Sequence, residues 1–104
     1  MREVKIRPRA QLDLESIYIY GALELGQPSA ARAMVNTLYD AFDRIAELPE
    51  AGMLFADEDL AQDYRRVLVK AYWVYYTFDN DSVVIWRVFH TRQDIANYTF
   101  VDLD

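Results

Sequence analysis

The sequence predicts an α+β fold in which a helical hairpin covers one face of a small, mostly antiparallel sheet, in the order β-α-α-β-β-β. Three observations indicate this fold: an alternation of charged and apolar residues near the N-terminus, two stretches with helical periodicity, and a run of aromatic and β-branched residues in the last third of the chain. A chain of 104 residues fits a single domain, here 1–104, in which 95–104 are only weakly patterned.

The first elements follow from a change of periodicity. Val4 and Ile6 alternate with charged residues, so a short half-buried strand is expected before the first proline. Helical spacing begins at Ala10, and Gly26 is a natural C-terminal stop. Pro28 suits the first turn of a second helix, which is expected to lie antiparallel to the first because few residues join them. The apolar face of this second helix comprises Ala31, Met34, Val35, Leu38, Ala41, Phe42, Ile45 and Leu48.

Three strands are expected in the last third of the chain. They cover 64–69, 72–78 and 83–89, where β-branched and aromatic residues concentrate. The turn at 79–82 makes the last two strands a hairpin. Residues 50–63 contain a glycine and an acidic group, and we expect them to form a loop.

Period-2 alternation assigns the strand residues to two faces. In the middle strand, one face receives Tyr72, Val74, Tyr76 and Phe78, and the other receives Trp73, Tyr75 and Thr77. In the last strand, Val84, Trp86 and Val88 are expected opposite Val83, Ile85, Arg87 and Phe89. Because the helical hairpin can cover only one face, the other aromatic face, with Trp73 and Tyr75, is expected to line a cleft or meet a partner.

Basic residues concentrate in these strands, although the net charge of the chain is −6. Residues 64–93 hold five Lys or Arg and two Asp, a net charge of about +3, so the rest of the chain carries about −9. Such a patch suits a phosphate-bearing or carboxylate-rich partner, or else pairs with acids on a solvated face. The net negative charge disfavours stable nucleic-acid binding by the whole surface.

Composition excludes several classes of site. The chain has no cysteine and one histidine, so neither a disulfide framework nor a thiolate or histidine metal site is expected, and we predict no cofactor. The N-terminal residues lack an apolar signal core, and no run approaches the ~20 apolar residues that span a bilayer. We therefore expect a soluble cytoplasmic protein without membrane contact.

Six side chains are candidates for contacts with a target: Arg65, Trp73, Tyr75, Arg87, His90 and Arg92. Arg65 and Arg66 adjoin on a strand, so they point to opposite faces and only one of them can serve a cleft. Arg87 is either a cleft residue or a buried guanidinium paired with an acid such as Asp13. His90 either forms a hydrogen bond that ends its strand or makes a functional contact near neutral pH.

Short motifs between residues 4 and 94 carry a family resemblance. They are Ala10-x-x-Asp13-Leu14-x-x-Ile17-x-x-Tyr20, Gly26 with Ala30, Pro49-x-x-Gly52, Tyr64-Arg65, Tyr72-x-Val74-x-Tyr76 and Ile85-x-Arg87-Val88-x-His90-x-Arg92-x-Asp94. In this order and spacing they resemble the ParE branch of the RelE/ParE toxin superfamily. The resemblance implies the toxin component of a type II toxin–antitoxin module, a ParE-like inhibitor of DNA gyrase. It also implies a cognate ParD-like antitoxin with a ribbon-helix-helix domain, and a homodimer or a toxin–antitoxin hetero-oligomer.

The superfamily also contains RNA-cleaving members, which the chemistry of the middle strand distinguishes. Those relatives resemble Tyr-Arg-Val-x-Tyr there, and the arginine holds the scissile phosphate; Trp73 stands at that position in this chain. An indole cannot stabilise phosphorane charge, and cleavage at a 2′-OH also needs an acid and a base. The resemblance therefore implies a binding inhibitor rather than an enzyme, and we assign no catalytic residue.

Two alternatives remain. The first is a RelE-like ribosome-dependent mRNA endonuclease, for which the candidate catalytic residues are Arg65, His90 and Arg92. The second is a toxin-derived domain that is not toxic and serves to bind its antitoxin or to dimerise.

Overall fold

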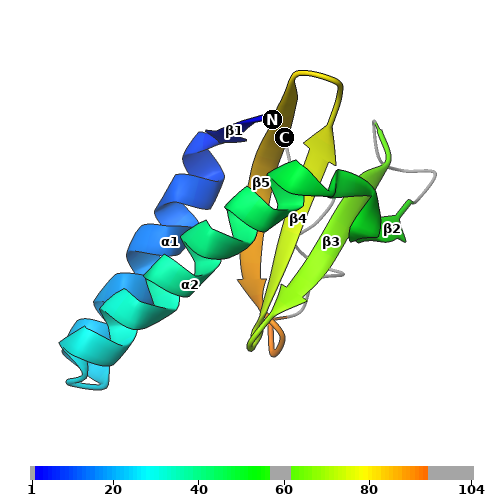
Figure 1. Ribbon diagram of the computed structural model, residues 1–104. Coiled ribbons are helices and arrows are strands. Elements are labelled where there is room, and N and C mark those ends of the chain that lie inside the picture. The colour runs from blue at the N-terminus through cyan, green and yellow to red at the C-terminus, as the bar shows by residue number, and fades with distance from the viewer. Residues whose placement is uncertain (1, 57–61, 94–104) are drawn as a thin grey trace.

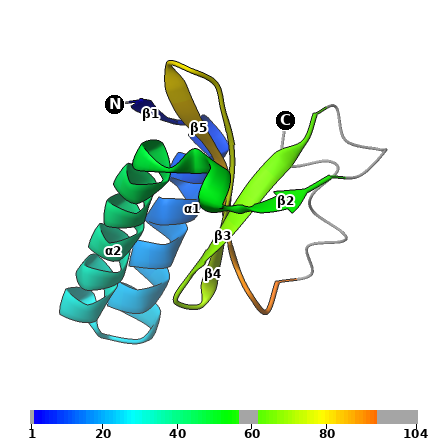
Figure 2. The ribbon, with the colours of Figure 1, turned by 45° about the vertical axis from the view of Figure 1, so that its right-hand side comes forward.

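The computed structural model describes residues 2–56 and 62–93, which form two long helices and a five-stranded sheet (Figure 1). The elements are β1 (Glu3–Ile6), α1 (Pro8–Ile19), a π-helical segment η1 (Tyr20–Glu24), α2 (Pro28–Glu47), a 3₁₀ turn η2 (Pro49–Ala51), β2 (Met53–Phe55), β3 (Tyr64–Val69), β4 (Tyr72–Phe78) and β5 (Ser82–His90). The strand order is β1-β5-β4-β3-β2; β1 runs parallel to β5, and the other pairs are antiparallel. Both helices lie on the same side of the sheet (Figure 2), as the sequence predicts.

The strand β2 is a correction, because residues 50–63 were expected to be a loop. Its three residues pair antiparallel with the first half of β3. A segment this short shows no alternation, so its pairing with β3 rather than its own pattern determines its conformation. The acidic group Asp57, Glu58 and Asp59 and the weakly patterned C-terminal tail lie outside the described residues.

The helical hairpin ends largely where the sequence predicts, with a proline in the first turn of each helix. Gly26 has a φ of 65°, the left-handed conformation that ends a helix and reverses the chain. Just before it, Tyr20–Glu24 is π-helical. Gly21 in this segment lies against α2, where a Cβ atom would be 2.8 Å from the Cβ of Ala31. Glycine therefore allows the two helices to approach closely here.

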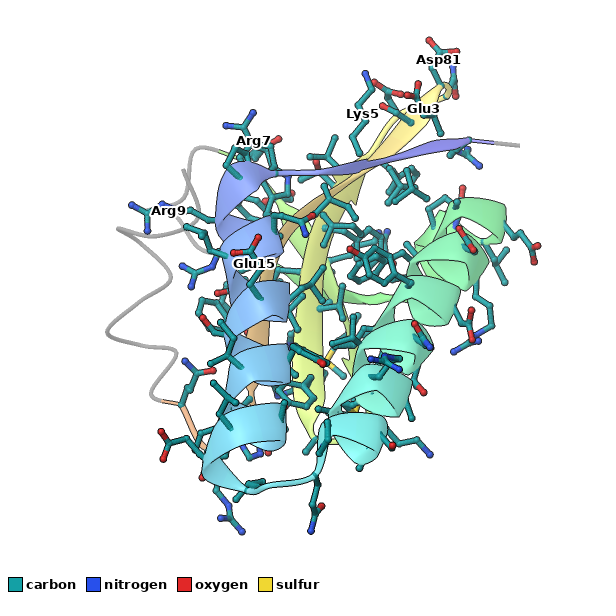
Figure 3. All side chains as sticks on the ribbon, turned by 90° about the vertical axis from the view of Figure 1, so that its left-hand side faces the viewer. Glu3, Lys5, Arg7, Arg9, Glu15 and Asp81 are labelled. Atoms are coloured by element: carbon teal, nitrogen blue, oxygen red, sulfur yellow. The ribbon has the colours of Figure 1, made fainter. Side chains whose placement is uncertain are left out.

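The two edges of the sheet carry different side chains. Glu3 and Lys5 are exposed on β1 (Figure 3), and charges on an edge strand oppose pairing with another chain. At the opposite edge, Met53 and Leu54 of β2 are apolar and more than half exposed, at 58% and 56%. The β2 edge is therefore the one suited to accept an added strand.

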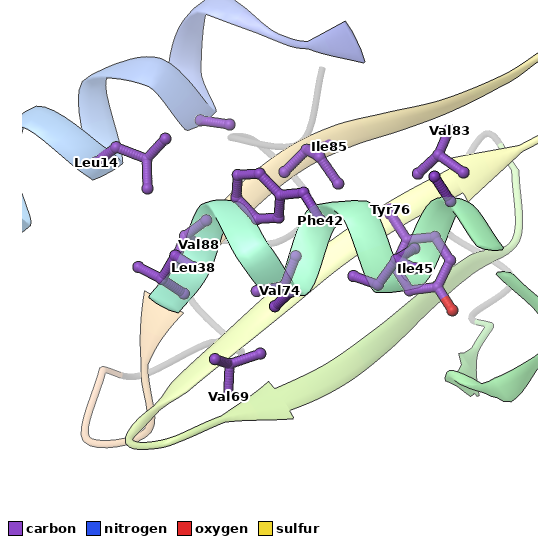
Figure 4. Packing of buried hydrophobic residues seen from close by; sticks show 13 residues of the cluster. Leu14, Leu38, Phe42, Ile45, Val69, Val74, Tyr76, Val83, Ile85 and Val88 are labelled. Atoms are coloured by element: carbon purple, nitrogen blue, oxygen red, sulfur yellow. The ribbon is translucent and has the colours of Figure 1, made fainter. Parts of the chain in front are cut away.

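The main core lies between the helices and the sheet (Figure 4). Phe42 of α2 is only 1% exposed, and it belongs to one cluster with Val74 and Tyr76 of β4. The sequence predicts this packing of the α2 face on the middle strand. Burying a side chain of this size stabilises the fold by ~1.5–3 kcal/mol.

A β-bulge makes the period-2 assignment wrong for part of β5. Between Tyr75 and Tyr76 of β4, the pairing skips one residue of β5, Trp86. Val88 therefore joins the main core, whereas Phe89 lies with Trp86 on the opposite face. Almost every residue here is apolar or aromatic, so the sequence carries no signal that locates the bulge.

Candidate functional site

The structure distributes the six candidate residues over separate places rather than in one cleft. Arg65 lies near the turn between α2 and β2. Its Nη1 donates to the carbonyl oxygens of Gly52 at 2.8 Å and of Glu50 at 3.2 Å. Arg65 thus stabilises a turn, and it does not accompany Trp73.

The same turn explains the Pro49-x-x-Gly52 motif. The Tyr76 hydroxyl donates to the carbonyl oxygen of Pro49 at 2.6 Å, and a Cβ atom on Gly52 would collide with that hydroxyl. Burial raises the pKa of Tyr76, so the hydroxyl remains a neutral donor. The motif is therefore structural.

Asp13 and Arg87 form a clamp between α1 and β5. Asp13 Oδ2 accepts from Arg87 Nε at 2.8 Å, and Asp13 Oδ1 accepts from Arg87 Nη2 at 2.9 Å. Oδ2 also accepts the backbone N–H of Val88 at 2.8 Å. The pairing of β1 with β5 ends at Ile6 and Ile85. Beyond this point, the Asp13 carboxylate provides a hydrogen-bond acceptor for the backbone of β5. Of the two readings of Arg87, the paired and largely buried guanidinium is confirmed, with side-chain exposures of 12% and 15% for Arg87 and Asp13.

Trp73 and Tyr75 lie on the sheet face that is turned away from the helices. Tyr75 is fully buried, so the prediction that it faces a partner is wrong. Burial raises the pKa of Tyr75, and its hydroxyl accepts a hydrogen bond from Arg66 Nη1 at 3.1 Å. Trp73 is half-buried, with the Arg66 guanidinium 4.1 Å from its ring centroid.

Arg66, and not Arg65, is the arginine that lies beside Trp73 and Tyr75. Adjacent strand residues point to opposite faces, as predicted, but only the register shows that Arg66, paired with Tyr75, belongs to the aromatic face. Arg65 is paired with Tyr76, which belongs to the main core. In the sequence, only the alternation of faces along the middle strand, extended to the strand before it, could indicate which of the two arginines shares a face with Trp73.

His90 and Arg92 border a groove of about 790 Å³ between the helical hairpin and the end of the sheet. His90 Nδ1 accepts the backbone N–H of Arg92 at 3.0 Å, and the His90 backbone N–H donates to Gln93 Oε1 at 2.6 Å. Both bonds turn the chain at the end of β5, as one of the two readings of His90 predicts. The neutral imidazole must then carry its proton on Nε2. The groove is lined by Asp13, Ser16, Ile17, Tyr20, Gly21, Leu25, Gln27, Ala30, Ala31, Met34, Tyr72, Val88, His90, Arg92 and Gln93.

The three candidate nuclease residues are not assembled. Arg65 is paired with Tyr76, whereas His90 is paired with Tyr72 at the other end of β4. Four residues along a strand correspond to about 13 Å. Within 2–56 and 62–93, no group of three or more His, Cys, Asp or Glu is placed to hold a metal ion.

The outward side of the helical hairpin is apolar and exposed. Leu12, Ile19 and Leu23 of α1 and η1 are 59%, 52% and 76% exposed. Beside them, a second groove of about 340 Å³ between the helices is lined in part by Tyr18, Ile19, Val35 and Tyr39. An apolar surface of this kind suits a partner that brings an amphipathic helix. Among the described helices, none is long and apolar enough to cross a membrane.

Comparison with known proteins yields one family and a similar structure. The family model described as "ParE toxin of type II toxin-antitoxin system, parDE" matches residues 4–95. A solved structure described as the chromosomal ParDE TA system from P. aeruginosa superposes with a TM-score of 0.70 at 17% identity, over 86% of this chain and 96% of that chain. At this identity the similarity shows the fold alone. No curated protein matches the sequence.

Proposed function

Because this chain belongs to the ParE family of type II toxin–antitoxin toxins, we propose that it inhibits DNA gyrase in the cytoplasm by binding, and that a ParD-like antitoxin with a ribbon-helix-helix domain neutralises it. The chain is the toxin component of such a module. The identity of the target, the type of antitoxin and the formation of a toxin–antitoxin hetero-oligomer are parts of the proposal.

The observation that carries inhibition by binding is the environment of Trp73. At the position where RNA-cleaving relatives place a phosphate-binding arginine, this chain has an indole whose ring lies 4.1 Å from the Arg66 guanidinium. That guanidinium is also hydrogen-bonded to Tyr75. An uncharged indole at that position cannot stabilise the charge that develops on a phosphate during cleavage.

We place the target contact at the groove bordered by His90 and Arg92. Arg92 is exposed at its rim, while Ile17, Met34 and Tyr72 supply apolar lining. A cationic rim around an apolar floor favours both rapid association and a buried anchor. Arg65 and Arg87 are already occupied in a turn and an ion pair, so we leave them outside the contact.

The antitoxin is proposed to occupy the other apolar surfaces. An amphipathic helix would cover Leu12, Ile19 and Leu23 on the outward side of the hairpin, and an extended segment would add to the β2 edge at Met53 and Leu54. Because these contacts are apolar, apolar burial should supply most of the affinity and charge should mainly set the association rate.

Purified protein should inhibit supercoiling of relaxed plasmid by gyrase, and antitoxin should restore it. Replacing Arg92 with alanine should raise the concentration for half-inhibition about tenfold, because a lost ion pair at a contact is worth on the order of 1.4 kcal/mol. The matched control is Arg44→Ala, an exposed arginine on α2. Equal inhibition by both variants would remove Arg92 from the contact, and a parent protein without effect on gyrase would remove gyrase as the target.

A further inference from the structure

The sheet face turned away from the helices forms a second aromatic core. Its rings make edge-on contacts, with centroid distances of 5.3 Å for Phe55–Tyr75, 5.6 Å for Tyr75–Phe89 and 5.8 Å for Tyr64–Trp86. Tyr75 and Phe89 have no exposed surface, yet the described residues place no helix over this face (Figure 2). A sheet face with buried rings needs a covering layer.

Three arginines lie on the rings of this face. The guanidinium carbon is 4.9 Å from the Trp86 centroid for Arg7, 4.1 Å from the Trp73 centroid for Arg66, and 4.4 Å from the Phe89 centroid for Arg87. The Nε of Arg66 is buried and has no hydrogen-bond partner among the described residues. A buried donor without an acceptor is costly, so the face suits a segment that brings both apolar side chains and acceptor oxygens.

We propose that the C-terminal segment of this chain, residues 94–104, docks on this arginine–aromatic face. The segment reads Asp-Ile-Ala-Asn-Tyr-Thr-Phe-Val-Asp-Leu-Asp: it has three aspartates and no lysine or arginine. Its charge therefore complements that of Arg7 and Arg66, whereas Arg87 is already paired with Asp13. Its apolar members are Ile95, Tyr98, Phe100, Val101 and Leu103.

The reach of the segment fits this assignment. It follows Gln93, three residues beyond the end of β5, and β5 supplies Trp86 and Phe89 to the face. Eleven extended residues span at most about 36–40 Å, whereas the nine residues of β5 span about 30 Å. The segment is thus long enough to run along the whole face. While it is docked, an acidic extended segment of another protein has to displace it to reach the arginines.

Both tryptophans of the chain, Trp73 and Trp86, lie on this face, so tryptophan emission reports on it alone. In the chain of residues 1–104, the double variant Phe100→Ala/Val101→Ala should raise the acrylamide quenching constant about twofold or more, because tryptophan rings that lose a covering layer become accessible to solvent. The matched control is Leu12→Ala/Leu23→Ala, which truncates two exposed apolar side chains on the helical hairpin and should leave quenching unchanged. Unchanged quenching in the tail variant would overturn the proposal.

A second measurement does not depend on truncating the tail. The chain contains no cysteine, so Thr99→Cys accepts a single bimane label, whose emission tryptophan quenches on contact. We expect a dim label in the folded protein and a bright one in denaturant, with Leu12→Cys as a control that stays bright in both. A bright label at position 99 in the folded protein would contradict docking. Quenching that grows with protein concentration would assign the tail to a second copy and would also overturn docking within one chain.

A further pair of variants tests whether the negative charges of the segment contribute to docking. Asp102→Asn/Asp104→Asn should increase quenching of the tryptophans by iodide, because Arg7 and Arg66 beside the two rings then attract the anion without the opposing charge of the aspartates. Asp40→Asn/Asp43→Asn removes the same charge from exposed positions of α2 and should not. Equal iodide quenching in the two variants would contradict the charge complementarity on which the proposal rests.

Discussion

Replacing Phe42 with alanine is expected to lower the free energy of unfolding by about 3–5 kcal/mol. The ring is 1% exposed, makes an edge-on contact with Tyr39 at 5.7 Å, and belongs to the cluster that joins α2 to β4. Removing the ring would leave a cavity between α2 and β4. Because both elements are held by other contacts of the same cluster, the cavity should not collapse, and the cost should lie in this range. The loss is a large share of the ~5–15 kcal/mol that stabilises a domain.

Urea titration of the parent, Phe42→Ala and the control Asp43→Ala measures this difference. Asp43 is the next residue of α2 and is exposed, so its truncation should change the stability by at most about 0.5 kcal/mol. A Phe42→Ala protein as stable as the parent would show that this face of α2 does not pack on the sheet.

Replacing Asp13 with alanine is expected to cost about 3 kcal/mol of unfolding free energy, because it removes the carboxylate that pairs with a largely buried guanidinium. The variant also removes the acceptor of the Val88 backbone N–H. The clamp joins α1 to β5 where β1 has ended, so its loss should loosen this edge of the sheet first. Hydrogen exchange of the Val88 amide should therefore accelerate more than that of Val74 in the middle strand.

Two further variants separate the ion pair from a general effect on α1. Glu15→Ala changes an exposed acid of the same helix and should be nearly neutral. Asp13→Ala/Arg87→Met should recover part of the lost stability, because the largely buried guanidinium is then removed together with its carboxylate. If the double variant is less stable than Asp13→Ala by the full cost of a second core change, the two residues do not act as a pair.

Patterns that repeat along the chain made most of the fold predictable. The apolar face of α2, its proline start and the glycine before it fix the helical hairpin, and the turn at 79–82 fixes the last strand pair. Asp79 explains that turn: its carboxylate accepts from the backbone N–H groups of Asp81 and Ser82, which lowers its pKa. Features without a repeat were missed, namely the three-residue strand β2 and the bulge at Trp86.

The candidate site was less predictable, because its residues depend on register and on contacts between distant segments. The pairing of Arg87 with Asp13 joins positions 74 residues apart, and the sequence left it as one of two possibilities. Tyr75 was assigned to the correct face, but alternation does not show that this face is buried. Which of Arg65 and Arg66 shares a face with Tyr75 was unpredictable for the same reason, since either arginine fits the pattern until the register is known.

The central claim is that this toxin acts on gyrase by binding and does not cleave mRNA. Its most direct test is to express the protein in cells without antitoxin and to map gyrase-linked DNA ends, with mRNA 5′ ends sequenced from the same culture. We expect DNA ends at gyrase sites that disappear when antitoxin is co-expressed, and no new mRNA ends phased with codons. Codon-phased mRNA ends without gyrase-linked DNA ends would contradict the claim and would assign the chain to the ribosome-dependent nucleases, and neither kind of end would identify it as a toxin-derived binding domain.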